Sequence, residues 1–136
     1  MFELSDQPID TGVLRSRLCH PEAGALVTFE GWVRNHNEGK AVTSLEYEAH
    51  AELATKEAGT ILREVRSKFN VQQVICVHRV GHLEIGDMAV WVGVTGAHRD
   101  EAFQVSRYVI DQLKERVPIW KKEHYLEGDS SWIGER

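Results

Sequence analysis

The chain has 136 residues, a hydrophobic content of 42% and a formal net charge of −5. This length fits one domain covering residues 1–136, whose core is large enough to need neither disulfides nor a metal. The acidic balance argues against a general nucleic-acid binder, and no stretch approaches the roughly 18 apolar residues of a membrane span. Because the N-terminus also lacks the apolar segment of a secretory signal, we expect a cytoplasmic protein in which any basic site is local.

The first half of the chain predicts short elements followed by one long helix. Residues 10–18 have the apolar spacing of a short helix, and residues 25–34 form a β-favouring run. The polar, glycine-containing segment 35–40 predicts a loop, and the alternation over residues 42–48 predicts another strand. Residues 51–69 carry apolar side chains at every third or fourth position, which predicts a long helix.

Two β-rich segments, residues 71–80 and 88–95, lie on either side of a predicted turn at residues 84–87, and together they predict a hairpin. Cys76 lies in the first of these segments, where we expect a buried and inert thiol. Cys19 follows the first helix and has no basic activator close to it in the sequence. Neither cysteine is therefore expected to act as a nucleophile.

Residues 100–117 predict a second long helix, which Pro118 ends. A strand over residues 119–126 and a short closing segment around Trp132 follow it. Strands and helices do not alternate strictly, so the order favours an α+β fold with mixed or antiparallel strands. The residues expected on the inward face of this helix are Phe103, Ser106, Val109, Ile110 and Leu113.

Basic residues occur at three places where anion-binding sites are common. His98 and Arg99 lie where a strand passes into a helix, and a helix N-terminus binds phosphate or carboxylate well. Lys114 and Lys121 lie on either side of the proline that ends the second long helix, and Arg34 follows a strand end. On the residues alone, solvated surface positions remain the simpler interpretation of all three.

The histidines do not predict a metal site. His78 and His82 are four residues apart, which in a strand separates them by roughly 13 Å. Neither a Cys-x-x-Cys nor a His-Glu-x-x-His motif is present. We therefore expect no metal and no cofactor.

Five motifs in one order resemble the large, catalytic subunits of molybdopterin synthase, the MoaE family. The likeness extends from about residue 25 to residue 132, and the order and spacing of the motifs together are highly specific. The motifs are Val33-Arg34-Asn35-His36-Asn37, Val77-His78-Arg79-Val80-Gly81, Gly86-Asp87, Val92-Gly93-Val94 leading to Ala97-His98-Arg99, and Leu113-Lys114 leading to Pro118-Ile119-Trp120-Lys121-Lys122-Glu123.

The resemblance implies a hammerhead-like α+β fold and a homodimer of large subunits within a heterotetramer. It also implies a small ubiquitin-like sulfur-carrier subunit, whose C-terminal Gly-Gly tail enters the pocket of the large subunit as a thiocarboxylate. The implied substrate is cyclic pyranopterin monophosphate, also called precursor Z. Two sulfurs are transferred to it from two successive carriers, which forms the dithiolene of molybdopterin.

Matching motifs also imply the residues of the site. Lys114 and Lys121 are the expected catalytic pair, which would activate the thiocarboxylate, stabilise oxyanions and move protons, with no division of these roles between them. The resemblance implies substrate binding by both lysines and by Arg34, His98, Arg99, Lys122, Glu123 and Arg136, and it gives Glu123 the further role of orienting a lysine.

The spacing of two of these residues suggests a shared pocket. In a straight helix, Arg99 and Lys114 are about 22 Å apart, because each residue adds about 1.5 Å. We therefore hypothesise that His98 and Arg99 of one chain face Lys114 and Lys121 of the other. Two alternatives stay open: a non-catalytic module that binds a ubiquitin-like tail, and an anion- or RNA-binding domain, against which the acidic charge counts.

Overall fold

The computed structural model describes residues 1–126 and 130–134, the latter as backbone only. Its first sheet has the strand order β1-β5-β7-β2. Strand β1 (Phe2–Ser5) runs parallel to β5 (Gln73–Arg79), and β5 and β2 (Ala25–Trp32) both pair antiparallel with β7 (Met88–Gly96). The predicted antiparallel pairing of these two segments is therefore confirmed, but β6 (Gly81–Glu84) lies between them, so they do not form a simple hairpin; β1 was not predicted.

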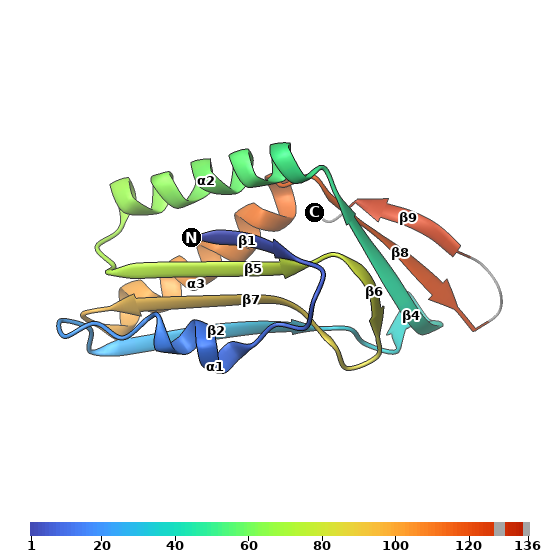
Figure 1. Ribbon diagram of the computed structural model, residues 1–136, viewed down its shortest axis with the longest axis horizontal. Coiled ribbons are helices and arrows are strands. Elements are labelled where there is room, and N and C mark those ends of the chain that lie inside the picture. Colours follow the sequence, from blue (N-terminus) through green and yellow to red (C-terminus); the bar gives the residue numbers. More distant parts are fainter. Residues whose placement is uncertain (127–129, 135–136) are drawn as a thin grey trace.

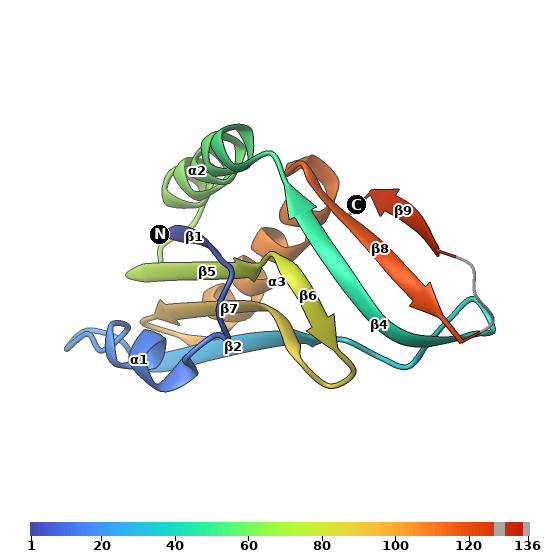
Figure 2. The same cartoon turned by 45° about the vertical axis from the view of Figure 1, so that its right-hand side comes forward.

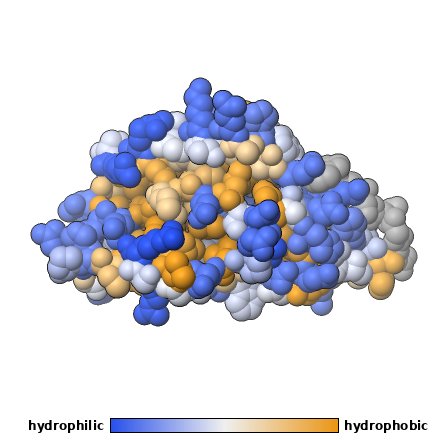
Figure 3. Space-filling model, viewed as in Figure 1, coloured by the Kyte–Doolittle hydropathy of each residue, from blue (hydrophilic) through white to orange (hydrophobic). Residues whose placement is uncertain are grey.

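Helices cover both faces of this sheet. The long helices α2 (Ala51–Lys68) and α3 (Arg99–Arg116) pack on one face, and the short helix α1 (Thr11–Ser16) packs on the other. Figure 3 shows hydrophilic side chains over the outer side of α2 and hydrophobic ones below it, over β1 and β5. In the described part of the chain, no helix combines the length and the apolar character needed to cross a membrane.

The second sheet extends beyond one end of the first (Figure 2) and has the order β3-β4-β8-β9, with β6 also paired to β4. Its strands are β3 (His36–Asn37), β4 (Lys40–Ala49), β6 (Gly81–Glu84), β8 (Ile119–Tyr125) and β9 (Ser130–Gly134). Strand β6 was not predicted, because the expected strand over residues 71–80 and turn at residues 84–87 left no element between them.

The core lies between the first sheet and the long helices. Val92 and Val94 of β7 are fully buried there, together with Ala54 of α2 and Val105 of α3. Phe103 is 60% exposed, so its predicted inward position is wrong, and Ala102 and Val105 contribute to the inward face instead. The rest of the architecture confirms the α+β fold with two long helices and mixed strands.

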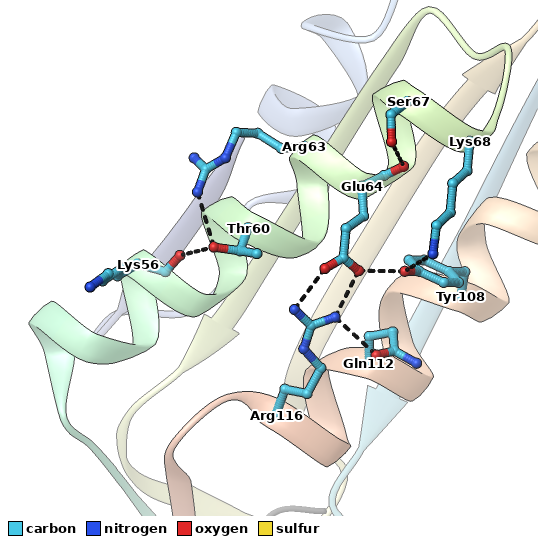
Figure 4. Close-up of polar contacts among 9 residues, drawn as sticks. All are labelled: Lys56, Thr60, Arg63, Glu64, Ser67, Lys68, Tyr108, Gln112 and Arg116. Carbon is cyan, nitrogen blue, oxygen red and sulfur yellow. Dashed lines mark hydrogen bonds and ion pairs between the residues drawn. The ribbon is translucent and has the colours of Figure 1, made fainter.

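An ion pair joins the two long helices (Figure 4). The guanidinium of Arg116 donates to both carboxylate oxygens of Glu64 at 2.7 and 2.8 Å, and Tyr108 donates its hydroxyl to the same carboxylate at 2.5 Å. Two parallel charge-assisted bonds of this kind fix geometry as well as adding stability. The bonds from Arg116, and then the one from Tyr108, lower the pKa of Glu64 to about 2.

This lowered pKa predicts acid sensitivity. The pKa of Glu64 in the folded chain lies well below that of an unfolded glutamate, which is about 4.3. The ionised Glu64 therefore contributes its full stabilisation above about pH 4.3, and this contribution is lost as the pH falls toward 2. We expect the urea midpoint to fall less in Glu64→Gln than in the wild type between about pH 6 and pH 3. Glu115→Gln, at the exposed position before Arg116, serves as the control. An equal fall of the urea midpoint in Glu64→Gln and in the wild type would contradict the linkage between pH and this ion pair.

Candidate active site

A pocket of about 300 Å³ opens where strands of both sheets meet the C-terminal end of α3. Its polar lining comes from five elements or their ends, and its apolar lining comes from strands β2, β4 and β7 and from Val33, which follows β2. The polar lining residues are Arg34, Asn37, Tyr47, Lys114, Lys121 and Glu123. The apolar ones are Phe29, Trp32, Val33, Leu45, Ala89 and Val90.

The end of β2 delivers Arg34 to the pocket. The pairing of β2 with β7 shifts register between Gly31 and Trp32, and a bulge of this kind turns the following side chains in a new direction. Gly31 permits the close approach of β7, because a Cβ there would lie 2.7 Å from a methyl carbon of Val90. Past the bulge, the backbone N–H of Val33 donates to the carbonyl of Asp87 at 2.9 Å, which holds the segment before Arg34.

Residues 35–40, predicted as a loop, form a tight hairpin instead, so that prediction is wrong. Asn37 pairs with Lys40, and both residues between them have positive φ, 50° at Glu38 and 78° at Gly39. Positive φ at both central positions matches the right-handed twist of a two-residue hairpin, and glycine allows it at the second position. The polar composition of the segment predicted a loop and gave no sign of strand pairing. The turn places Asn37 over the pocket.

Asn37 holds the one carboxylate among the described residues that line the pocket. Its side-chain N–H donates to Glu123 Oε1 at 2.7 Å, and its carbonyl oxygen accepts from Arg34 Nη2 at 3.5 Å. Glu123 is only 4% exposed, so this donor compensates for part of the cost of burying a charge. Asn37 belongs to the first motif of the family resemblance but was not predicted as a site residue.

The register of β4 against β8 sets the floor of the pocket. Tyr47 lies directly opposite Lys121, and Leu45 lies opposite Glu123. Because alternate residues of a strand share a face, all four side chains point to the same side of the sheet. Tyr47 is 7% exposed and contacts the ring of His78 edge-on at 4.8 Å between centroids. Tyr47 was also missed, because its position depends on strand register rather than on local sequence.

The C-terminal end of α3 contributes Lys114. The helix ends at Arg116, the backbone N–H of Val117 still donates to Leu113, and β8 begins at Ile119 after Pro118. This short connection brings Lys114 and Lys121 to one pocket from two different elements. The pocket therefore has three cationic side chains and one carboxylate, in a chain whose net charge is −5.

Three of the remaining predicted site residues, His98, Arg99 and Lys122, are not among the described residues that line this pocket. His98 and Arg99 are exposed at the opposite end of α3, where His98 makes no side-chain capping bond (Figure 1). Lys122 lies on β8 between Lys121 and Glu123, and the alternation of the strand directs it to the other face. Arg136 lies outside the described residues.

Neither cysteine belongs to the described lining. Cys76 is buried, and burial raises the pKa of its thiol to about 12, which confirms the predicted buried position. Cys19 is exposed and lies beyond α1. The described lining can thus bind an anion and stabilise negative charge, but it holds no thiol of its own.

Comparison with known proteins identifies the family. The MoaE protein family matches residues 4–116. The molybdopterin synthase catalytic subunit of Thermoplasma volcanium is 41% identical over 130 residues, which cover 96% of this chain and 95% of the relative. The crystal structure of molybdopterin synthase from Staphylococcus aureus matches with a TM-score of 0.92 and 39% identity, covering 98% of this chain and 96% of that one.

A third match shows the fold alone. A complex of subunits 1 and 2 of molybdopterin-converting factor from Helicobacter pylori contains a chain with a TM-score of 0.80 and 20% identity, covering 99% of this chain and 91% of that one. The fold and the cation-lined pocket define an α+β protein whose described lining suits an anionic ligand. The chain belongs to the MoaE family, that of the molybdopterin synthase catalytic subunits.

The bond between Asn37 and Glu123 predicts a measurable contribution to stability. Asn37→Ala leaves a buried carboxylate without this donor, which typically costs about 1–3 kcal/mol. We expect urea unfolding to show a loss of that size, and a smaller loss when Asn37→Ala is made in a Glu123→Gln background. Asn70→Ala, at an exposed position, is the matched control. Equal losses in the two backgrounds would mean that Asn37 does not act through Glu123.

Proposed function

We propose that this chain is the sulfur-transferring catalytic subunit of a molybdopterin synthase. It takes sulfur from the C-terminal thiocarboxylate of a small ubiquitin-like carrier and transfers it to cyclic pyranopterin monophosphate, which gains the two sulfurs of its dithiolene. The observation that carries this proposal is the pocket in which Arg34, Lys114 and Lys121 surround a buried Glu123 and no thiol is among the described lining residues. A nucleophile that arrives on a partner makes a cysteine of the chain unnecessary.

The cations of the pocket suit the two charges that the reaction brings to it. The substrate carries a cyclic phosphate, and Arg34 offers a planar guanidinium that can bind phosphate oxygens in a bidentate manner. Lys114 and Lys121 are the catalytic pair, which donate to the thiocarboxylate and to the oxyanion that develops on its carbonyl, and exchange protons with the reacting groups. Glu123 and Asn37 position this set, since they connect β8 to Arg34.

A second chain completes the pocket in this proposal. His98 and Arg99 lie at the far end of a helix of 18 residues from Lys114, a separation of about 22 Å along its axis. A substrate of pterin size cannot contact both ends of that helix in one chain. We therefore assign His98 and Arg99 to the pocket of the partner chain in a homodimer, with Arg136 as a further substrate-binding residue.

The carrier subunit completes a heterotetramer of two large and two small chains in the cytoplasm. The Helicobacter pylori structure contains both subunits of molybdopterin-converting factor, which supports a two-subunit assembly for this chain as well. Trp32, which lines the pocket, is 66% exposed, so a partner's tail can reach this side of the pocket from solvent. A Gly-Gly tail suits such a pocket, because it has no side chains to exclude.

The lysines provide the first functional test. We expect Lys114→Ala and Lys121→Ala each to lower product formation from cyclic pyranopterin monophosphate and thiocarboxylated carrier by about 100-fold or more, as loss of one charge-stabilising donor does elsewhere. Carrier binding, measured by calorimetry, should stay close to that of the wild type. Lys56→Ala, on the exposed side of α2, is the matched control. A folded wild type that binds the carrier and forms no product would favour the non-catalytic tail-binding module.

Mixed dimers test the shared pocket. We expect the Arg99→Ala homodimer and the Lys114→Ala homodimer each to be nearly inactive. In each homodimer, both pockets lack the substituted residue. Mixing the two variants by subunit exchange should restore up to about a quarter of wild-type activity, since half of the dimers are mixed and each of these has one intact pocket. Activity that does not rise above that of the parent variants would contradict the shared pocket.

A further inference from the structure

A second cluster of chemically active side chains lies on the back of the sheet that carries the pocket. Glu46 of β4, His82 of β6 and His124 of β8 each offer one ligand atom, and these atoms lie within 4.8 Å of one another. Glu46 is directly opposite His82 in the ladder, and His124 is opposite Ser44, one pleat away on the same face. Three strands therefore bring the cluster together, although His82 and His124 are 42 residues apart in the sequence.

The side chains of this cluster are already in contact. His124 Nε2 lies 3.4 Å from Glu46 Oε1, and His82 Nε2 lies 2.9 Å from Oε1 of Glu84, the next residue of β6 on the same face. The two imidazole rings are 6.4 Å apart between centroids and tilted by 34°. The exposed fractions of these side chains, 30% for His124 and 51% for His82, leave them accessible to an ion from solvent.

We propose that Glu46, His82 and His124 bind a divalent transition-metal ion, with Zn²⁺ the best fit. Two imidazole nitrogens and a carboxylate oxygen form a donor set that zinc accepts, whereas Mg²⁺ and Ca²⁺ prefer oxygen ligands. Bonds of about 2.1 Å in a tetrahedral site place neighbouring ligand atoms about 3.4 Å apart. The distance between Glu46 Oε1 and His124 Nε2 already has this value. Rotation of the exposed His82 side chain can bring its ring nitrogen to the same distance from the other two ligand atoms.

The local charges favour a cation. Glu46 and Glu84 bring two carboxylates to this face, while Lys122, the cross-strand neighbour of Glu46, brings one ammonium group. The fourth coordination position is left to water or to Glu84, which lies beside His82. The site is distinct from the pocket, because its ligands alternate along β4 and β8 with Tyr47, Lys121 and Glu123 on the opposite face.

The bound ion would stabilise the strand pairing of the second sheet. It would connect β4, β6 and β8, the strands whose register places Tyr47 and Lys121 in the pocket. An ion that binds only the folded chain stabilises it in proportion to the logarithm of its concentration above Kd. Metal binding should therefore raise the unfolding temperature without any contribution from substrate or carrier.

Calorimetric titration of the metal-free chain with ZnCl₂ near neutral pH tests the proposal. We expect one Zn²⁺ per chain and a rise in unfolding temperature on saturation, with no binding heat from MgCl₂. His82→Ala and His124→Ala should each weaken Zn²⁺ binding by at least about a hundredfold and abolish the thermal shift, because each removes a direct ligand and loss of even an outer partner of a ligand costs about tenfold to a hundredfold.

His20→Ala, which removes a histidine on the far side of the first sheet, is the matched control and should bind Zn²⁺ like the wild type. Circular dichroism of each metal-free variant shows whether it is folded, and Glu46→Gln is the milder ligand change if a histidine variant unfolds. Absence of Zn²⁺ binding to the wild type, or unchanged affinity in folded variants of the cluster, would overturn the proposal.

Discussion

The short connection between α3 and β8 is the constraint on which the site depends. Pro118 cannot continue a helix, so α3 ends at Arg116 and the chain enters β8 at Ile119 with only two residues between. The carbonyl of Pro118 accepts from the backbone N–H of His50 at 3.2 Å, which ties this connection to the start of α2. Lys114 and Lys121 reach one pocket because the helix stops there and the strand pairs with β4.

The ion pair between the long helices supports the same corner. Arg116 is two residues after Lys114, and its two bonds to Glu64 hold the last turn of α3 against α2 (Figure 4). On the other side, β8 alternates between the pocket and the Glu46–His82–His124 cluster. The pocket thus lies between two sets of contacts that fix a helix end and a strand register, as a preorganised charged site requires.

Local sequence patterns predicted the long helices, the antiparallel pairing of β5 with β7 and the strand after Pro118, because each rests on periodicity or on a proline. They did not predict β1, whose four residues need the edge of β5, or the tight hairpin at Glu38–Gly39. Arg34, Lys114, Lys121 and Glu123 were selected by resemblance, and the fold brings them together. Asn37, Tyr47 and the cluster of Glu46, His82 and His124 depend on cross-strand register, which no local pattern contains.

We propose that sulfur brought by a carrier is transferred in this pocket without a thiol of the chain. The direct measurement is a single-turnover reaction of a variant that lacks both cysteines, Cys19→Ser with Cys76→Ala, with cyclic pyranopterin monophosphate and excess thiocarboxylated carrier. We expect molybdopterin to form at close to the wild-type rate, with two carriers consumed for each product. Formation of product by the wild type but not by the folded cysteine-free variant would contradict it.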